Sequence, residues 1–251
     1  MERSTLNKLR LFVNRLLAPS GFEIGRRTVG EVGLMEGAIT RLPELGFEFG
    51  SVIDIGAAAG SWTSMSSSIL TGPMFLMVEA LREREPVLRA LVSTDPSRLK
   101  YQVCAVGPCS GSTSFSVTAD LDGSGVSGEG NQGPVEVRTV EMRTLDQLAV
   151  AHSLKPPYLV KFDTHGFEVP ILNGAPNLLK LTDVIVMECY FLEGPNRTVM
   201  FWQMCHIMDT IGFRCFDIVD QLYRPTDGRL WQVDLLFARK EWHGFRPQNW
   251  S

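Results

Sequence analysis

The sequence lacks the features that would place the chain in a membrane or in an oxidising compartment. It has no run of roughly 18 consecutive apolar residues, so we expect no transmembrane helix. The opening segment, Met1–Asn7, has neither the apolar core nor the small-residue cleavage site of a signal peptide. The five cysteines form no C-x-x-C pair, which is typical of free thiols in a reducing compartment. We therefore expect a cytoplasmic protein that does not engage a membrane.

A strong charge of one sign is also missing. The chain has 24 Lys and Arg against 28 Asp and Glu, a net charge of −4. This balance argues against a nucleic-acid partner held by phosphate neutralisation. The 23 glycines and 14 prolines follow no strict period, which excludes a collagen-like chain. With 251 residues, and roughly 150 per domain as a guide, the chain fits one large α/β domain.

The first fifty residues predict helices that precede this domain. Position 46 is a glycine, and the pattern predicts a helix over 34–45 that ends there. Further upstream, apolar residues recur at spacings of three and four and so share one helical face: Leu6, Leu9, Phe12, Val13, Leu16 and Leu17. That helix is either packed on the main sheet or a lid or dimerisation arm, which is compatible with a homodimer. We predict a helical extension over 1–50 and the main domain over 51–251.

From Ser51 onward, short apolar runs alternate with helical stretches. Such runs are typical of buried parallel strands. The predicted strands span 51–55, 74–79, 101–106, 158–163 and 184–188, and a hairpin-like pair follows at 213–219 and 230–238. The predicted helices span 83–92, 167–181 with an interruption near Gly174 and Pro176, and 198–211. The sequence predicts an α/β fold with a mostly parallel seven-stranded sheet, an antiparallel C-terminal strand and helices on both faces.

A long segment rich in Gly, Ser and Asp interrupts this alternation between Gly107 and Pro134. It is too long for an ordinary connection, so it is either a substrate-facing loop or a mobile one. Two runs with strand-like alternation, 113–118 and 135–141, flank its central part.

The loop after the first predicted strand has the pattern Asp54-x-Gly56-x-x-x-Gly60. Glycine lets the backbone approach a ligand closely, and the helix that follows offers free N–H groups at its start. A dinucleotide fingerprint would need G-x-G-x-x-G, but Ala58 stands at the second glycine and the third is absent. The small-residue loop therefore favours a ligand that has no pyrophosphate.

Glu79 ends the next predicted strand, 23 residues after Gly56. A carboxylate at this position can accept hydrogen bonds from two vicinal ribose hydroxyls, as in nucleotide-binding sheets. The alternative is a surface carboxylate that begins the next helix.

The segment 161–168, Lys-Phe-Asp-Thr-His-Gly-Phe-Glu, ends another predicted strand. In open α/β sheets such strand ends line the ligand crevice. Asp163 could hold a substrate or a ligand amine, and His165 is the histidine placed to act near neutral pH. The alternative is that Asp163 and Glu168 cap the following helix. Glu188 ends the next strand and adds a further polar group at the same rim.

Taken in order, these motifs resemble the FkbM family of S-adenosylmethionine-dependent methyltransferases. The resemblance extends over about residues 51–237. It is carried by 52–63 (Val-Ile-Asp-Ile-Gly-Ala-Ala-Ala-Gly-Ser-Trp-Thr), 78–80 (Val-Glu-Ala), 143–146 (Arg-Thr-Leu-Asp), 158–168 (Tyr-Leu-Val-Lys-Phe-Asp-Thr-His-Gly-Phe-Glu), 171–175 and 186–188. It implies a Rossmann-like class I methyltransferase fold and S-adenosylmethionine as the cofactor.

The resemblance also implies roles for individual residues. The loop with Asp54, Gly56, Ala58 and Gly60 would hold the methionine end of the cofactor. The ribose would lie on Glu79, and Asp163 would lie near the point of methyl transfer. The family often has Asn in place of Ala58, and usually Val-Glu-Gly in place of Thr164-His165-Gly166.

We therefore expect methyl transfer to a small hydroxylated acceptor, such as a sugar or a natural-product intermediate, with His165 or Asp163 as the base. No metal site is assigned, although Asp163, His165 and Glu188 could supply ligands. One alternative is a non-catalytic sensor or scaffold that binds S-adenosylmethionine, suggested by Ala58 and by the Thr164-His165 pair. The other is a nicotinamide-dependent oxidoreductase, which the missing glycine disfavours.

Overall fold

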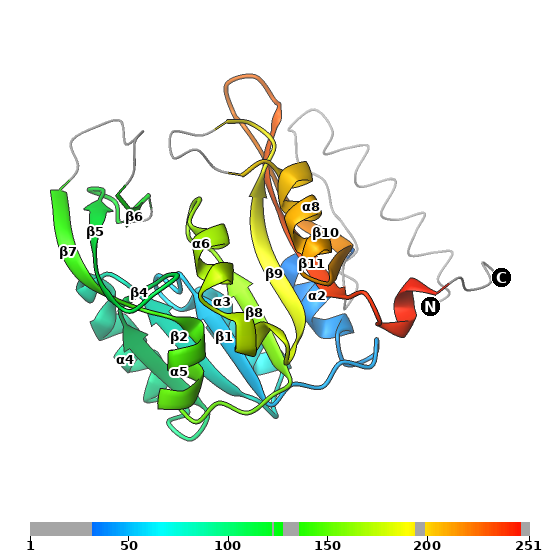
Figure 1. The fold of residues 1–251 in the computed structure, drawn as a ribbon, viewed down its shortest axis with the longest axis horizontal. Helices are drawn as coiled ribbons and strands as arrows, with labels where there is room; N and C mark the ends of the chain where they lie inside the picture. The colour runs from blue at the N-terminus through cyan, green and yellow to red at the C-terminus, as the bar shows by residue number, and fades with distance from the viewer. Residues whose placement is uncertain (1–31, 122, 128–135, 194–198, 247–251) are drawn as a thin grey trace, which may run out of the picture.

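The computed structural model describes residues 32–121, 123–127, 136–193 and 199–246 (Figure 1). Its centre is a seven-stranded sheet in the order β10-β11-β9-β8-β1-β2-β3. The strands are β1 (Ser51–Ile55), β2 (Met74–Glu79), β3 (Leu99–Val103), β8 (Tyr158–Phe162), β9 (Thr182–Tyr190), β10 (Phe213–Tyr223) and β11 (Leu230–Arg239).

The strand directions agree with the sequence prediction. Strands β3, β2, β1, β8 and β9 pair in parallel. Strand β11 pairs antiparallel with both β9 and β10, so the C-terminal strand is the reversed one. The carboxyl ends of β1, β2, β8 and β9 therefore meet at one edge of the sheet, and this edge carries the residues singled out in the sequence.

Helices cover both faces of the sheet, as predicted. One face packs against α5 (Leu145–Ala151), α6 (Glu168–Asn173), α7 (Pro176–Leu179) and α8 (Phe201–Thr210). The other face packs against α2 (Met35–Arg41), α3 (Ser61–Ile69) and α4 (Glu85–Val92), the last preceded by η2 (Arg82–Arg84). A further short helix, η3 (His243–Phe245), follows β11.

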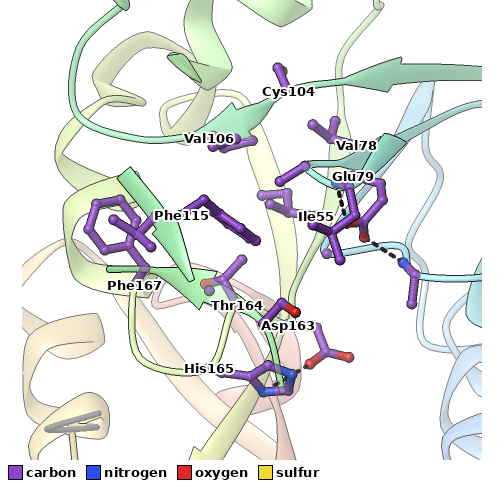
Figure 2. A pocket seen from close by; sticks show the side chains of 18 of the residues that line it. Ile55, Val78, Glu79, Cys104, Val106, Phe115, Asp163, Thr164, His165 and Phe167 are labelled. Carbon is purple, nitrogen blue, oxygen red and sulfur yellow. Dashed lines mark hydrogen bonds and ion pairs between the residues drawn. The ribbon is translucent and has the colours of Figure 1, made fainter. Parts of the chain in front are cut away.

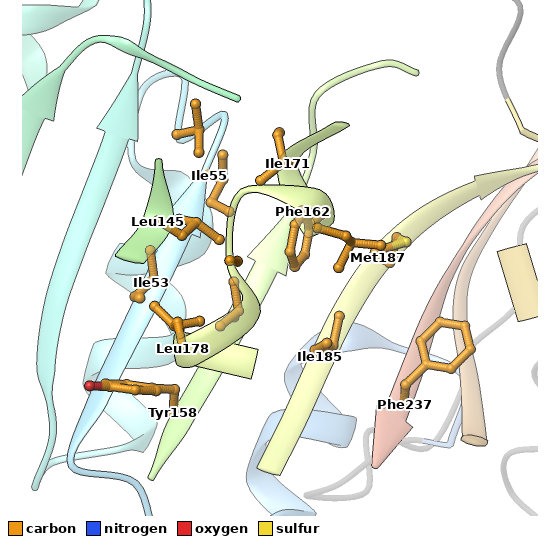
Figure 3. Close-up of a cluster of buried hydrophobic side chains, with 14 of the residues drawn as sticks. Ile53, Ile55, Leu145, Tyr158, Phe162, Ile171, Leu178, Ile185, Met187 and Phe237 are labelled. Atoms are coloured by element: carbon orange, nitrogen blue, oxygen red, sulfur yellow. The ribbon is translucent and has the colours of Figure 1, made fainter. Parts of the chain in front are cut away.

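Alternation along the strands divides the core between these two faces. Side chains such as Ile53, Phe162 and Met187 point towards α5–α8 and are buried there (Figure 3). Their neighbours Val52 and Val186 point to the opposite side, towards α2–α4. Successive side chains of a strand alternate between faces, and both faces are covered, so the strands appear in the sequence as continuous apolar runs.

The third predicted strand, 101–106, is split in the structure. Strand β3 begins at Leu99 and ends at Val103, and Cys104 separates it from β4 (Ala105–Val106). Strand β4 leaves the main sheet and pairs with β7 (Glu136–Arg143). The residues of the run in β3 are partly buried and those from Cys104 to Val106 are buried, so one largely apolar run serves two different sheets.

The strands that flank the Gly- and Ser-rich segment form a small second sheet in the order β4-β7-β5-β6 (Figure 1). Strand β5 (Gly111–Val117) pairs antiparallel with β7 and with β6 (Gly125–Val126). Phe115 and Val117 are buried in a cluster with Leu81, so this sheet packs against the loop after β2. Residues 122 and 128–135 of the segment lie outside the described residues.

Two further predictions meet different outcomes. The interruption of the helix over 167–181 is confirmed, because α6 ends at Asn173 and α7 begins at Pro176. The helix predicted over Leu6–Leu17, with its proposed role in a dimer, lies outside the described residues, and the division at residue 50 stays a prediction. Within the described ranges, no helix has the length and apolar character needed to cross a membrane.

Candidate active site

A cavity of about 290 Å³ opens at the carboxyl edge of the sheet (Figure 2). Six residues singled out in the sequence line it together: Gly56, Ala58, Glu79, Asp163, His165 and Glu188. Apolar side chains from the main sheet and from the small second sheet complete the wall, among them Ile55, Val106, Phe115, Leu121 and Val126. An apolar wall with a few convergent polar groups is typical of a small-molecule site.

The loop between β1 and α3 forms one side of the cavity. Gly56 has a φ of +76°, and a Cβ atom built there would lie 1.9 Å from the carbonyl oxygen of Asp163. Glycine is therefore required by both the backbone conformation and the close approach of the loop after β8. Gly60 also has a φ of +76° and stands at the N-terminus of α3, where a Cβ would contact Leu91.

Glu79 connects this loop to the end of β2. One oxygen of its carboxylate accepts a hydrogen bond from the N–H of Ala58, and the other accepts one from the N–H of Leu81, both at 2.9 Å. Each carboxylate oxygen can accept a second bond, so the group can still receive hydroxyl donors from the cavity. Burial raises the pKa of Glu79, and the backbone donors partly oppose this shift.

Asp54 is the buried acidic residue of β1, two positions before Gly56. Its carboxylate is not among the groups that line the cavity; it accepts a hydrogen bond of 2.7 Å from the hydroxyl of Thr63 and lies 3.9 Å from the Lys161 ammonium. Burial raises the pKa of Asp54, although the positive charge of Lys161 opposes that shift. Gly60 is likewise absent from the cavity wall. A contact of either residue with the cofactor stays a prediction.

Lys161 stands between two carboxylates. Its ammonium donates to Asp163 at 2.6 Å and lies 5.8 Å from the ring centroid of Trp62. Burial by itself disfavours the charged ammonium, but the carboxylates of Asp54 and Asp163 outweigh it and raise the pKa of Lys161. Lys161 is therefore positively charged and holds one oxygen of Asp163.

His165, Asp163 and Glu188 converge at the rim of the cavity. The Nδ1 atom of His165 lies 3.4 Å from a Glu188 oxygen and 4.0 Å from an Asp163 oxygen. His165 has a φ of +53°, in the left-handed region that histidine adopts more readily than most residues. The side chains come from the ends of two neighbouring strands, β8 and β9. The cluster can hold a proton or a cation between its oxygens and the imidazole nitrogen.

Two residues next to this cluster, Tyr190 and Gln232, were not assigned a role from the sequence. The hydroxyl of Tyr190 donates to Glu188 and lies 3.1 Å from Nδ1 of His165, and the side-chain amide of Gln232 donates to the other Glu188 oxygen at 2.7 Å. Burial, followed by the charge of Glu188, raises the pKa of Tyr190, so it remains a donor. Gln232 faces Tyr190 in the antiparallel register of β11 and β9, which no local motif encodes.

Asp146, Glu168 and Asp234 lie outside the cavity wall. Asp146 caps α7 rather than its own helix, accepting from the backbone N–H groups of Asn177 and Leu178. Glu168 accepts from the N–H of Gly166, so it holds the turn after β8, whereas the N-terminus of α6 has no side-chain cap. Asp234 is partly buried, and its desolvation raises its pKa to about 7.

The fold and site define a class: an open α/β sheet with a glycine loop after its first strand and an acidic residue at the end of its second, both facing one cavity. Within that class, the model of the methyltransferase FkbM domain matches residues 54–215, nearly two thirds of the chain. The chain belongs to this family of methyltransferases. S-adenosylmethionine is therefore its cofactor, as the sequence predicts, and the predicted class I arrangement is confirmed by the strand order.

Solved structures with a similar fold include several methyltransferases. A 1,6-didemethyltoxoflavin N1-methyltransferase from Burkholderia thailandensis is 12% identical, with a TM-score of 0.46 over 81% of this chain and 77% of that one. A putative RNA methyltransferase from Pyrococcus horikoshii is 14% identical, with a TM-score of 0.43 over 81% and 82%. A precorrin-6y C5,15-methyltransferase from Geobacter metallireducens is 11% identical, with a TM-score of 0.43 over 88% and 95%.

No curated protein matches the chain. The family assignment rests on the domain match and not on these distant structures.

Proposed function

We propose that the chain is an O-methyltransferase that acts on a small hydroxylated acceptor. The observation that carries this proposal is the convergence of Asp163, His165 and Glu188 at the rim of the cavity, beside the loop of Gly56. Three groups able to accept a proton or hold a hydroxyl stand where the acceptor would meet the methyl group. Transfer to oxygen gains from removal of a proton, which such a cluster can supply.

The residues that line the cavity would hold S-adenosylmethionine as follows. Glu79 would accept from the ribose hydroxyls, and the loop with Gly56 and Ala58 would hold the methionine end, where Asp163 could receive its ammonium group. The apolar wall around Ala105 and Phe115 would surround the adenine. Two observations support this assignment of the cofactor: Gly56 packs closely on the backbone of Asp163, and the carboxylate of Glu79 lies at the cavity wall.

When bound, S-adenosylmethionine supplies a methyl carbon whose bond to sulfur breaks, with both electrons staying on sulfur, as the bond to the acceptor oxygen forms. The protein's part is mainly to align the acceptor with that carbon. Lys161 donates to one oxygen of Asp163, and Gln232 and Tyr190 donate to Glu188, so both carboxylates are held in place by hydrogen bonds. The hydroxyl proton would pass to Asp163 or to His165.

Asp163, His165 and Glu188 lie at the rim, beside the part of the cavity assigned to the cofactor, and these polar groups suit a small acceptor that carries a hydroxyl. A sugar or a natural-product intermediate with a free hydroxyl meets this description.

The first test is calorimetric titration with S-adenosylmethionine and S-adenosylhomocysteine. We expect binding of one equivalent of each, and the absence of binding at millimolar ligand would reject the assignment of the site. The second test follows transfer of a radiolabelled methyl group to a panel of hydroxylated acceptors. A matched panel of amines tests oxygen against nitrogen as the acceptor atom.

A non-catalytic sensor or scaffold is the competing proposal, because Ala58 and the Thr164-His165 pair depart from the family pattern. It predicts that the cofactor binds normally while no acceptor in the panel is methylated. If an acceptor is found, His165→Ala and Asp163→Asn separate the two ideas, since an enzyme loses turnover in at least one of these variants.

A further inference from the structure

We propose that Asp163, His165 and Glu188 form a binding site for a divalent cation of the first transition row, such as Mn²⁺. The proposal rests on the proposed function of the same cavity. It specifies how the residues at the rim would bind and activate the acceptor hydroxyl. Neither the sequence motifs nor the domain match assigns a metal ion to this cluster.

The geometry of the three side chains suits such an ion. One ligand atom from each residue, Nδ1 of His165 and one oxygen from each carboxylate, lies within 4.8 Å of the others. Ligands about 2.1 Å from a six-coordinate ion lie roughly 3 Å apart when adjacent. The contact from Nδ1 to Glu188 is already 3.4 Å, and the contact to Asp163 is 4.0 Å. Binding of an ion would draw the three atoms closer together.

Donors behind the cluster turn the carboxylates towards this point. Lys161 holds the Oδ2 atom of Asp163 at 2.6 Å, and Gln232 holds the Oε2 atom of Glu188 at 2.7 Å. In each case the other oxygen, Oδ1 or Oε1, is the one that faces Nδ1 of His165, and the Tyr190 hydroxyl, which also donates to Oε1, would turn away from that oxygen when the ion binds. Groups that hydrogen-bond the distal atom of a ligand and so orient it are a regular feature of protein metal sites.

The donor set also indicates the kind of ion. Two carboxylates and one imidazole bring a charge of −2 when the imidazole is neutral, which a divalent ion offsets. Carboxylates alone favour Mg²⁺ or Ca²⁺, whereas imidazole favours transition metals. The mixture therefore favours Mn²⁺ or a neighbouring ion over Mg²⁺. Asp163 and His165 are partly exposed to the cavity, so coordination positions remain open on the side where the acceptor would bind.

An ion at this point would bind the acceptor hydroxyl and lower its pKa. The proton would leave to a solvent water, and the oxygen lone pair would form the bond to the methyl carbon as the carbon–sulfur bond breaks. The thioether product keeps the electron pair of that bond. His165 would then be a ligand through Nδ1 and not the base, which sets this inference apart from direct proton transfer to the imidazole.

The test uses the full chain after treatment with EDTA and gel filtration. Titration with MnCl₂ is followed by calorimetry and by the loss of the free Mn²⁺ signal in electron paramagnetic resonance. We expect one ion per chain, and we expect His165→Asn and Glu188→Gln each to weaken binding at least about tenfold. Asp209→Asn is the matched control, because Asp209 is an exposed carboxylate on α8 that pairs with Lys240. The Mn²⁺ affinity of this variant should equal that of the wild type.

Circular dichroism spectra and thermal transitions show whether the variants are folded, and Asp163→Asn provides a third ligand variant if one of them is not. No Mn²⁺ binding up to about 1 mM, or equal binding in the wild type and the ligand variants, would overturn the proposal. Titration of the same samples with S-adenosylhomocysteine keeps the two ideas separate. Cofactor binding by the wild type without Mn²⁺ binding rejects the cation site alone, whereas the absence of cofactor binding by the wild type rejects the proposed function.

Discussion

The carboxylate of Asp54 and the ammonium of Lys161 lie 3.9 Å apart in the middle of the main sheet, where β1 and β8 pair these two residues directly. Both side chains are almost completely buried. Among the described residues, no hydrogen bond reaches the Oδ1 atom of Asp54, so the charge of Lys161 is its main compensation. Asp54 precedes Gly56 by two residues and Lys161 donates to Asp163, so the pair links the glycine loop to the segment after β8.

Removal of the ammonium should therefore destabilise the fold. In Lys161→Met the buried Asp54 carboxylate loses its counter-charge, and we expect the free energy of unfolding to fall by about 3–5 kcal/mol. Urea denaturation followed by circular dichroism measures this change. Asp54→Asn combined with Lys161→Met should recover part of the loss, because no uncompensated charge remains. Arg89→Gln, which breaks the exposed pair with Glu85, should leave stability unchanged.

Substitution at Gly56 should disturb both the fold and the cofactor site. A Cβ in Gly56→Ala would meet the carbonyl of Asp163, and alanine also resists a φ of +76°. We expect a loss of more than about 2 kcal/mol in unfolding free energy and at least a tenfold weaker affinity for S-adenosylhomocysteine. Gly72→Ala is the control, since no atom lies within 4 Å of the added carbon. Equal behaviour of the two variants would contradict the close-packing argument.

The affinity for the cofactor should depend on pH through Glu79. Burial raises the pKa of this carboxyl, so it takes up a proton at a higher pH than an exposed glutamate and then accepts hydroxyl donors poorly. The affinity for S-adenosylhomocysteine should fall as the pH is lowered from 8 to 5. Glu79→Ala should weaken binding about 10- to 100-fold at pH 8, in line with the loss of hydrogen bonds to a charged group. Calorimetry across the pH range measures both effects, and Glu79→Gln should abolish the part of the dependence that Glu79 causes.

The cysteines should differ sharply in reactivity. Burial raises the pKa of Cys104 to about 12, so roughly one thiol in 10⁴ is ionised at pH 8. Cys109 is exposed. Iodoacetamide followed by peptide mass mapping should modify Cys109 first, and the modification rate at Cys104 should rise about tenfold per pH unit between pH 8 and 10. S-adenosylhomocysteine should protect Cys104, which lines the cavity. Equal rates at pH 8 would contradict the buried position.

Much of the site could be predicted from the sequence because its parts occur in short contiguous segments. The loop of Gly56 follows a strand directly, Glu79 ends one strand, and Asp163 and His165 follow another. The carboxyl ends of parallel strands meet at one edge, so these side chains come together once the strands are recognised. The part of the site formed by Tyr190 and Gln232 depends on the register of β9 and β11, in which these two residues, 42 positions apart in the chain, face each other.

The amino-acid sequence by itself determined the family, the main strands and the acidic residues at their ends, because buried parallel strands and helix breaks leave local patterns of apolar residues, glycine and proline. Only the tertiary structure decided that the run over 101–106 divides at Cys104 between two sheets. It also decided that Asp54 faces Lys161 and Thr63 instead of the cavity. A local sequence pattern predicts which residues are buried and the periodicity of the element. The partner of a buried carboxylate on a neighbouring strand depends instead on contacts between segments distant in the chain.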